Sequence, residues 1–120
     1  MENAPSTALP IEFKTLGQLC DEYTIERIKT DKLNKSHQTM FELWAAICRR
    51  CYGTVPFNLL EIIDELYTCN KEIWLLIDLA MAGEHCGRDV QIANNRRREI
   101  VREIDQFAGG THPLDEKAYQ

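Results

Sequence analysis

The side chains in this chain best suited to chemistry are polar residues on the apolar faces of two long segments with helical spacing. Asn70 interrupts one apolar stripe and Asp78 flanks it, while Asn94 and Arg97 fall on the apolar side of the other. An unpaired buried charge costs several kcal/mol, so an inward-facing arginine needs a carboxylate or an anionic ligand. We therefore expect Asp78 to pair with Arg97, and Asn70 and Asn94 to satisfy the remaining hydrogen-bonding groups.

Two roles are open for this polar set. One is a sealed structural network that fixes the register of the helices, which is the best-attested use of buried polar groups in bundles. The other is a pocket for a small anion or polar ligand, with the forked guanidinium of Arg97 as its donor. Asp21 and Thr24 share the apolar side of an earlier helical segment and can join either site.

The cysteines suggest a second chemistry. Cys48 and Cys51 lie three positions apart on one helical face, and His85 and Cys86 could complete a zinc site of three thiolates and one imidazole. Zinc pairs of this spacing usually sit in a knuckle with a nearby glycine, and here none follows until Gly53. The five cysteines are odd in number, which argues against a disulfide framework. We expect thiols packed between helices, with no metal and no cofactor.

The carboxylates suggest an enzymatic alternative. All-helical nucleotide pyrophosphohydrolases hold magnesium with paired E-x-x-E and E-x-x-D patterns on facing helices. Glu61 and Asp64 in "EIID" fit one half, whereas Glu99 and Glu103 in "EIVRE" have the wrong spacing for the other. The sequence contains no legible nucleophile–base pair and no phosphate-binding glycine loop, so it favours a binding protein over an enzyme.

Four helical segments must position these side chains. The sequence contains no period-2 alternation of apolar and polar residues, so we expect no strand. Thr15 with Gln18, Ser36, and Asn58 with Glu61 are the candidate N-terminal caps of the first three. Glycines mark the ends of the last three helices, at Gly53, Gly83 and Gly109–Gly110. The predicted fold is an all-α helical bundle built on a long antiparallel hairpin of the third and fourth helices, with two further N-terminal helices packed across it. Four aromatic residues fall at core-like positions: Phe41, Trp44, Tyr67 and Trp74.

Length and composition suit one soluble domain. The chain has 120 residues, of which 44% are hydrophobic and 28% charged, and no apolar run reaches the roughly 18 residues of a membrane span. We expect a helical domain at 15–108 between flexible tails at 1–14 and 109–120. The first ten residues lack the features of a signal peptide, so we expect a cytoplasmic protein. The net charge of −5 makes nucleic acid an unlikely partner.

Three motifs resemble a family of small helical bacterial and phage-borne proteins known only as a domain of unknown function. "TLGQLCDEYTIERIKTDKL" resembles its opening G-E-L-hydrophobic-D-K-x-T-I-x-x-I-K, "NKEIWLLID" its N-x-x-L-W-x-x-E-D, and "NNRRREIVREID" its N-D-R-R segment. The chain departs from the pattern at Gln18, Glu22, Ile77 and Asn95. The resemblance spans about 15–108 and implies a helical domain, often encoded near surface-polysaccharide genes, with no established activity.

Residues and resemblance together lead to one functional expectation and two alternatives. We expect a non-enzymatic binding or assembly module with a protein partner or self-association. The alternatives are a phage- or bacterium-encoded protein that sequesters a small anion or nucleotide, and a metal-dependent nucleotide pyrophosphohydrolase. The candidate ligand-binding set, or structural network, is Asp21, Lys29, Asn70, Asp78, Asn94 and Arg97.

Overall fold

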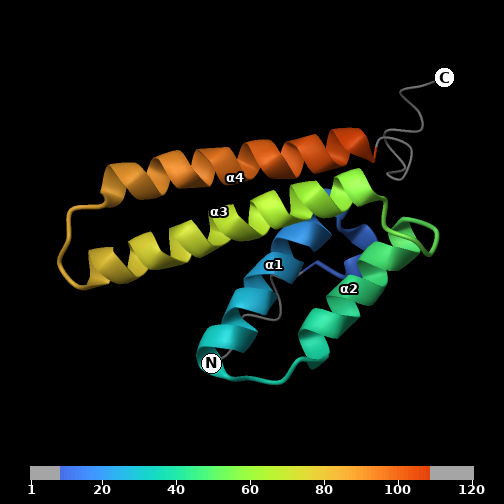
Figure 1. Ribbon diagram of the computed structural model, residues 1–120, viewed down its shortest axis with the longest axis horizontal. Helices are drawn as coiled ribbons and strands as arrows, with labels where there is room; N and C mark the ends of the chain where they lie inside the picture. Colours follow the sequence, from blue (N-terminus) through green and yellow to red (C-terminus); the bar gives the residue numbers. More distant parts are fainter. Residues whose placement is uncertain (1–8, 109–120) are drawn as a thin grey trace.

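The computed structural model describes residues 9–108, and this part of the chain is all-α with no strand, as predicted. Its elements are a 3-10 turn η2 (Ile11–Phe13) and the helices α1 (Leu16–Leu33), α2 (Gln38–Arg50), α3 (Phe57–Met81) and α4 (Gly87–Phe107) (Figure 1). Residues 1–8 of the predicted N-terminal tail at 1–14 lie outside the described residues, as does the predicted tail at 109–120 with its glycine stop at 109–110. The turn η2 falls inside the segment expected to be the N-terminal tail, and Ile11 packs against the core.

Helix α1 is the centre of the arrangement, because it contacts α2, α3 and α4. The helices α3 and α4 run side by side in opposite directions and are joined by a short turn (Figure 1). Helices α1 and α2 lie on one side of this pair, near the beginning of α3. The second half of α3 and the beginning of α4 therefore extend past α1.

The start of α1 follows the predicted capping chemistry, and the starts of α2 and α3 differ from it. The Thr15 hydroxyl accepts the Gln18 N–H (3.1 Å) and the Gln18 side chain accepts the Thr15 N–H (2.8 Å), which confirms the predicted capping box. The Ser36 hydroxyl accepts the backbone N–H of Gln38, the first residue of α2 (3.1 Å), but the N-cap residue is His37, so the predicted cap at Ser36 is one residue too early. The predicted cap at Asn58 is wrong, because α3 already begins one residue earlier, directly after Pro56, without a side-chain cap.

The helix ends use left-handed backbone, as predicted for α2 and α3. Gly53 (φ 103°) and Gly83 (φ 102°) follow the last turns of α2 and α3, and Asn34 (φ 52°) ends α1. Glycine has no Cβ to clash in this conformation, and asparagine tolerates it better than most residues.

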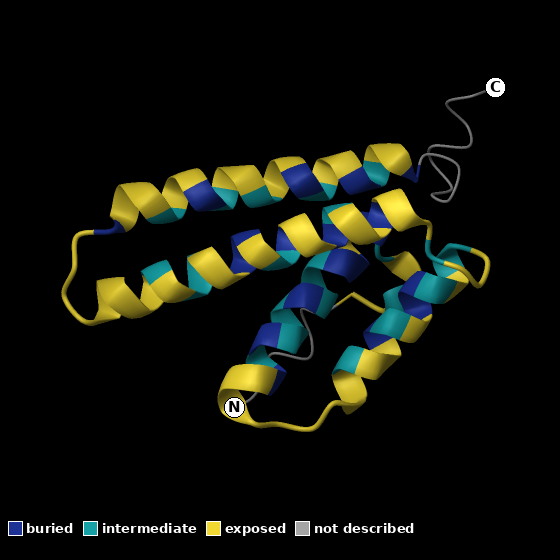
Figure 2. Cartoon of the chain, viewed as in Figure 1, coloured by how far each residue is buried: buried dark blue, intermediate teal, exposed yellow. Residues whose placement is uncertain are grey.

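The core lies where α1 meets the other three helices (Figure 2). Leu19 of α1, Ile47 of α2, Leu59 and Leu66 of α3, and Ile104 of α4 are fully buried there. The predicted core aromatics divide: Trp44, Tyr67 and Trp74 are half-buried, but Phe41 is 62% exposed, so its core assignment is wrong. Phe41 lies near the start of α2 and stacks on His37, with ring centroids 5.8 Å apart.

Candidate functional site

A polar network joins α1, α3 and α4 at the place where α1 crosses the other two helices. The Asp21 carboxylate of α1 accepts a hydrogen bond from the Arg97 guanidinium of α4 (2.6 Å) and another from the Asn70 amide of α3 (3.1 Å). The predicted pair of Asp78 and Arg97 is therefore wrong: the inward-facing arginine finds its carboxylate on α1.

Thr24 completes the network from one turn further along α1. Its hydroxyl accepts the Asn70 amide (2.8 Å) and donates to the backbone carbonyl of Asp21 (2.8 Å). Asn70 and Thr24 are buried, with 5% and 0% of their surfaces exposed. Residues three apart share a helix face, so Asp21 and Thr24 meet the same neighbour on α3.

The charges of the network neutralise each other. The side chains of Arg97 and Asp21 keep 28% and 15% exposure, so their attraction is only partly screened by water. Both Asp21 oxygens accept hydrogen bonds, one from each partner helix. The Nε of Arg97 is buried without a hydrogen-bond partner among the described residues. The arrangement can hold three helices in register. The Arg97 guanidinium, its only cation, is already paired with Asp21.

The other predicted members lie outside the network. Asp78 is exposed, and its carboxylate makes no hydrogen bond or ion pair within residues 9–108. It lies two turns past Asn70, on the part of α3 that extends beyond α1. Asn94 is half-buried, and the described part of the chain gives its amide no hydrogen bond. Lys29 approaches Glu26 at 3.9 Å with 40% of its side chain exposed.

Sequence reasoning missed a second polar contact between α1 and α4. The Asp105 carboxylate accepts the backbone N–H of Gly17 (2.7 Å) and the hydroxyl of Thr15 (3.1 Å). An anionic side chain at a helix N-terminus satisfies unpaired N–H groups and complements the helix dipole. A carboxylate from a distant helix gives no local signal, so only the fold reveals this cap.

The same contact explains the glycine at position 17. A Cβ there would lie 2.5 Å from the Val101 carbonyl oxygen and 2.8 Å from an Asp105 carboxylate oxygen. Real Cβ atoms do not approach this closely, and a helix backbone carbonyl cannot easily move. Glycine at this position therefore lets α1 and α4 touch directly.

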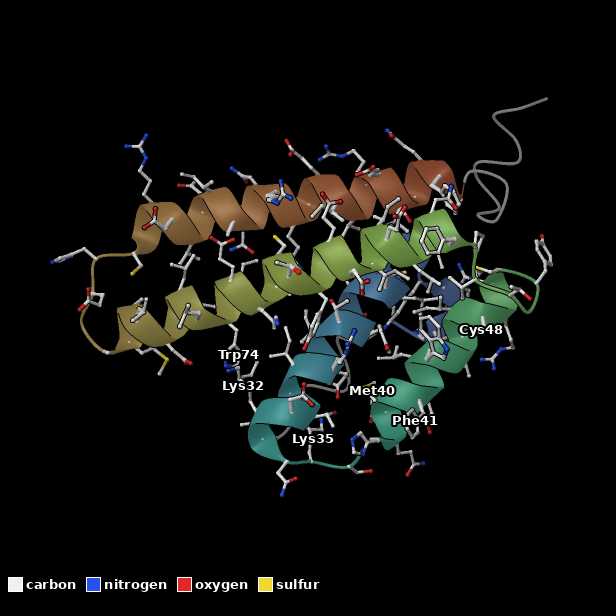
Figure 3. All side chains as sticks on the ribbon, viewed as in Figure 1. Lys32, Lys35, Met40, Phe41, Cys48 and Trp74 are labelled. Carbon is white, nitrogen blue, oxygen red and sulfur yellow. The ribbon has the colours of Figure 1, made fainter. Side chains whose placement is uncertain are left out.

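The thiols do not form the zinc set that the spacing suggested. Cys48 lies near the end of α2 (Figure 3), whereas His85 and Cys86 lie at the turn between α3 and α4, at the opposite end of α3. No group of three histidine, cysteine or acidic side chains within the described residues converges as metal ligands would. Burial raises the pKa values of the Cys20, Cys51 and Cys69 thiols.

The carboxylates of the enzymatic alternative are dispersed. Glu61, Asp64 and Glu65 line an open surface hollow of about 510 Å³ along α3, together with Asn58. Glu99 and Glu103 are exposed on α4. The described residues do not bring the two halves of a magnesium-binding pattern onto one cleft.

Fold and site define a small all-α protein in which one central helix is tied to two others by a polar network. No family model matches the chain, and comparisons with curated proteins and with solved structures found no match. No helix in the described part of the chain is long and apolar enough to cross a membrane.

Proposed function

We propose that this protein is a non-enzymatic assembly module built on an antiparallel hairpin of α3 and α4, whose distal end binds another protein chain. The distal end comprises residues 73–92: the last turns of α3, the connecting turn and the first turns of α4. The observation that carries the proposal is the apolar surface of this end.

The exposure of large apolar side chains is high at the distal end. Met81 is 83% exposed, Ile92 58%, Leu75 57% and Ile77 44%. A helix that is apolar on all sides is normally buried on all sides, because each buried apolar side chain contributes about 1.5–3 kcal/mol. Here α4 covers one side of the α3 segment, and the other sides face outward (Figure 2).

One apolar stripe of α3 is covered in its first half and uncovered in its second. Asn70 contacts α1, and Trp74, Ile77 and Met81 follow it at spacings of four, three and four, which keeps them on the same face of the helix. Figure 3 shows Trp74 projecting from α3 on the side where α1 lies. Trp74 is half-buried, whereas Ile77 and Met81 are 44% and 83% exposed, so the stripe loses its cover over the last turns of α3. Contiguous exposed apolar surface is typical of a protein-binding site.

The polar network supports a structural role within this module. The short contact between Arg97 and Asp21 uses the cation that an anionic ligand would need. The network is one of the contacts that hold α1 across the hairpin, over the first half of the apolar stripe.

A photo-reactive residue at position 81 tests the proposed function. We expect illumination of cells that make the full chain to give protein adducts of discrete mass. The matched control carries the same residue at Arg49, an exposed position on α2. If positions 81 and 49 give the same diffuse background, the distal end does not bind a protein and the proposal is wrong.

A further inference from the structure

We infer that the chain bound at the distal end presents an acidic amphipathic helix, which lies along the last turns of α3 beside the end of α1. The inference rests on the proposed function and names the chemistry of the partner. The face to be covered runs from Lys71 to Met81, which is about 15 Å of α3 and matches a helix of about three turns. The apolar stripe of this face indicates a helix, and the cations beside it indicate carboxylates on that helix.

Helix α1 shows which kind of element the stripe accepts. It covers the first half of the stripe as a helix, and its contact there includes Asn70. Trp74, Ile77 and Met81 continue the stripe at the same spacing, and their exposure increases toward the end of α3. Side chains at spacings of three and four form the ridges and grooves into which another helix packs its own apolar side chains. A partner helix would therefore follow α1 along the same stripe.

Three cations gather at the start of this face. Lys32 of α1 and Lys71 of α3 are exposed, and together with Tyr67 they line an open hollow of about 510 Å³ between the two helices. The guanidinium carbon of Arg27 lies 4.1 Å from the centre of the Tyr67 ring, and the Lys71 ammonium lies 4.7 Å from it. An aromatic ring attracts cations but has no net charge, so this contact holds the two cations without neutralising them.

The three cations form no ion pair within residues 9–108. By contrast, Lys29 and Lys35, near the same end of α1, both pair with Glu26. The lining of the hollow also includes the Asp31 carboxylate, which leaves the cations in excess. Because the whole chain has a net charge of −5, this positive site is a local feature. It complements a partner that brings carboxylates to the start of the uncovered stripe.

The first experiment compares the affinities of the purified full chain for two synthetic amphipathic peptides by fluorescence anisotropy at low salt. Both peptides carry leucines at spacings of three and four, and the flanking positions are glutamate in one peptide and lysine in the other. We expect the glutamate peptide to bind at least about fivefold more tightly. High salt should reduce this difference, because it screens exposed charges.

Charge reversal locates the cations that set the preference. Lys32→Glu combined with Lys71→Glu should make the lysine peptide the tighter ligand. Arg49→Glu combined with Arg98→Glu is the matched control, since it changes the net charge equally at exposed positions of α2 and α4. The control should leave the glutamate peptide the tighter ligand. Circular dichroism checks that all variants are folded.

Two single variants test the rest of the face. Met81→Asp should raise the dissociation constant of the glutamate peptide at least about tenfold, because it places a carboxylate in an apolar contact. Asp78 is an exposed carboxylate on the same flank of α3 as Lys71. Asp78→Asn removes its repulsion and should lower the dissociation constant of the glutamate peptide by about twofold.

Failure of this inference is distinguishable from failure of the proposed function. Equal affinities for the two peptides, no binding of either at millimolar concentration, or the same loss of preference in both double variants would overturn the acidic helix. Photo-adducts at position 81 with twice the mass of the chain would identify a second copy as the partner and would also overturn it. If position 81 gives discrete adducts in any of these cases, the proposed function stands.

Discussion

Replacement of Asp21 by alanine perturbs the network that joins three helices. The change removes the carboxylate that accepts from Arg97 at 2.6 Å and from Asn70 at 3.1 Å. Arg97 would be left as an unpaired charge with only 28% of its side chain exposed. Asn70 would keep its hydrogen bond to Thr24, so most of the cost should come from the arginine.

The magnitude follows from the burial of the pair. Removing one partner of a fully buried ion pair costs about 3–5 kcal/mol. Water reaches part of the guanidinium, so we expect a loss of about 2–3 kcal/mol in the free energy of unfolding. For a domain of this size the melting temperature should fall by roughly 10–20 °C.

Urea unfolding followed by circular dichroism measures this loss, with the urea dependence of the wild type and variant compared to confirm two-state behaviour. Asp78→Ala is the matched control: it also removes one aspartate from the domain, but from an exposed position, and should change stability by less than about 0.5 kcal/mol. Arg97→Met should destabilise as Asp21→Ala does, and the double variant should cost clearly less than the sum of the two. Additive effects, or equal effects of Asp21→Ala and Asp78→Ala, would refute the assigned pair.

Three further predictions concern the contact of α1 with α4 and the buried thiol. Gly17→Ala should lower the free energy of unfolding, measured in urea, by about 2–4 kcal/mol, because the added Cβ has no room, although alanine normally favours a helix. Gly87→Ala is the control: a Cβ at Gly87 meets open space, so this variant should not be destabilised. Asp105→Ala should cost about 1–2 kcal/mol through loss of the α1 cap, against almost nothing for the exposed Glu103→Ala. Burial raises the pKa of the Cys20 thiol, so the folded chain keeps a proton that the unfolded chain releases above about pH 9. Stability should therefore fall as the pH rises above this value, with a shallower slope in Cys20→Ala.

Each of these has a contrary outcome. A Gly17→Ala variant as stable as the wild type would mean that α1 and α4 do not touch directly. Equal losses of stability in Asp105→Ala and Glu103→Ala would mean that Asp105 does not cap α1. If stability falls with pH between 8 and 11 as steeply in Cys20→Ala as in the wild type, a group other than Cys20 causes the alkaline loss of stability.

The helices themselves were readable from the sequence because the signals that make them are local. Thr15 and Gln18 lie three residues apart and cap one turn, and Gly53 and Gly83 take a backbone conformation that depends on their own lack of a side chain. The inward direction of Asn70 also followed from spacing along one helix. At Asn58 the local signal failed: α3 begins at Phe57, with Pro56 as its N-cap residue and no side-chain cap hydrogen bond.

The partners of the polar side chains were decided by the tertiary structure alone. Helical spacing places Arg97 on an inner face, but it cannot say which neighbouring helix crosses there. The nearest carboxylate by the simplest hairpin register was Asp78, whereas the crossing of α1 brings Asp21, 76 positions away along the chain, within 2.6 Å. The Asp105 cap, at 88 positions from Gly17, was invisible for the same reason. Local sequence determines the backbone conformation and the helix face on which each side chain lies. Which faces meet depends on the packing angle between whole helices, and that angle results from many contacts spread along the chain.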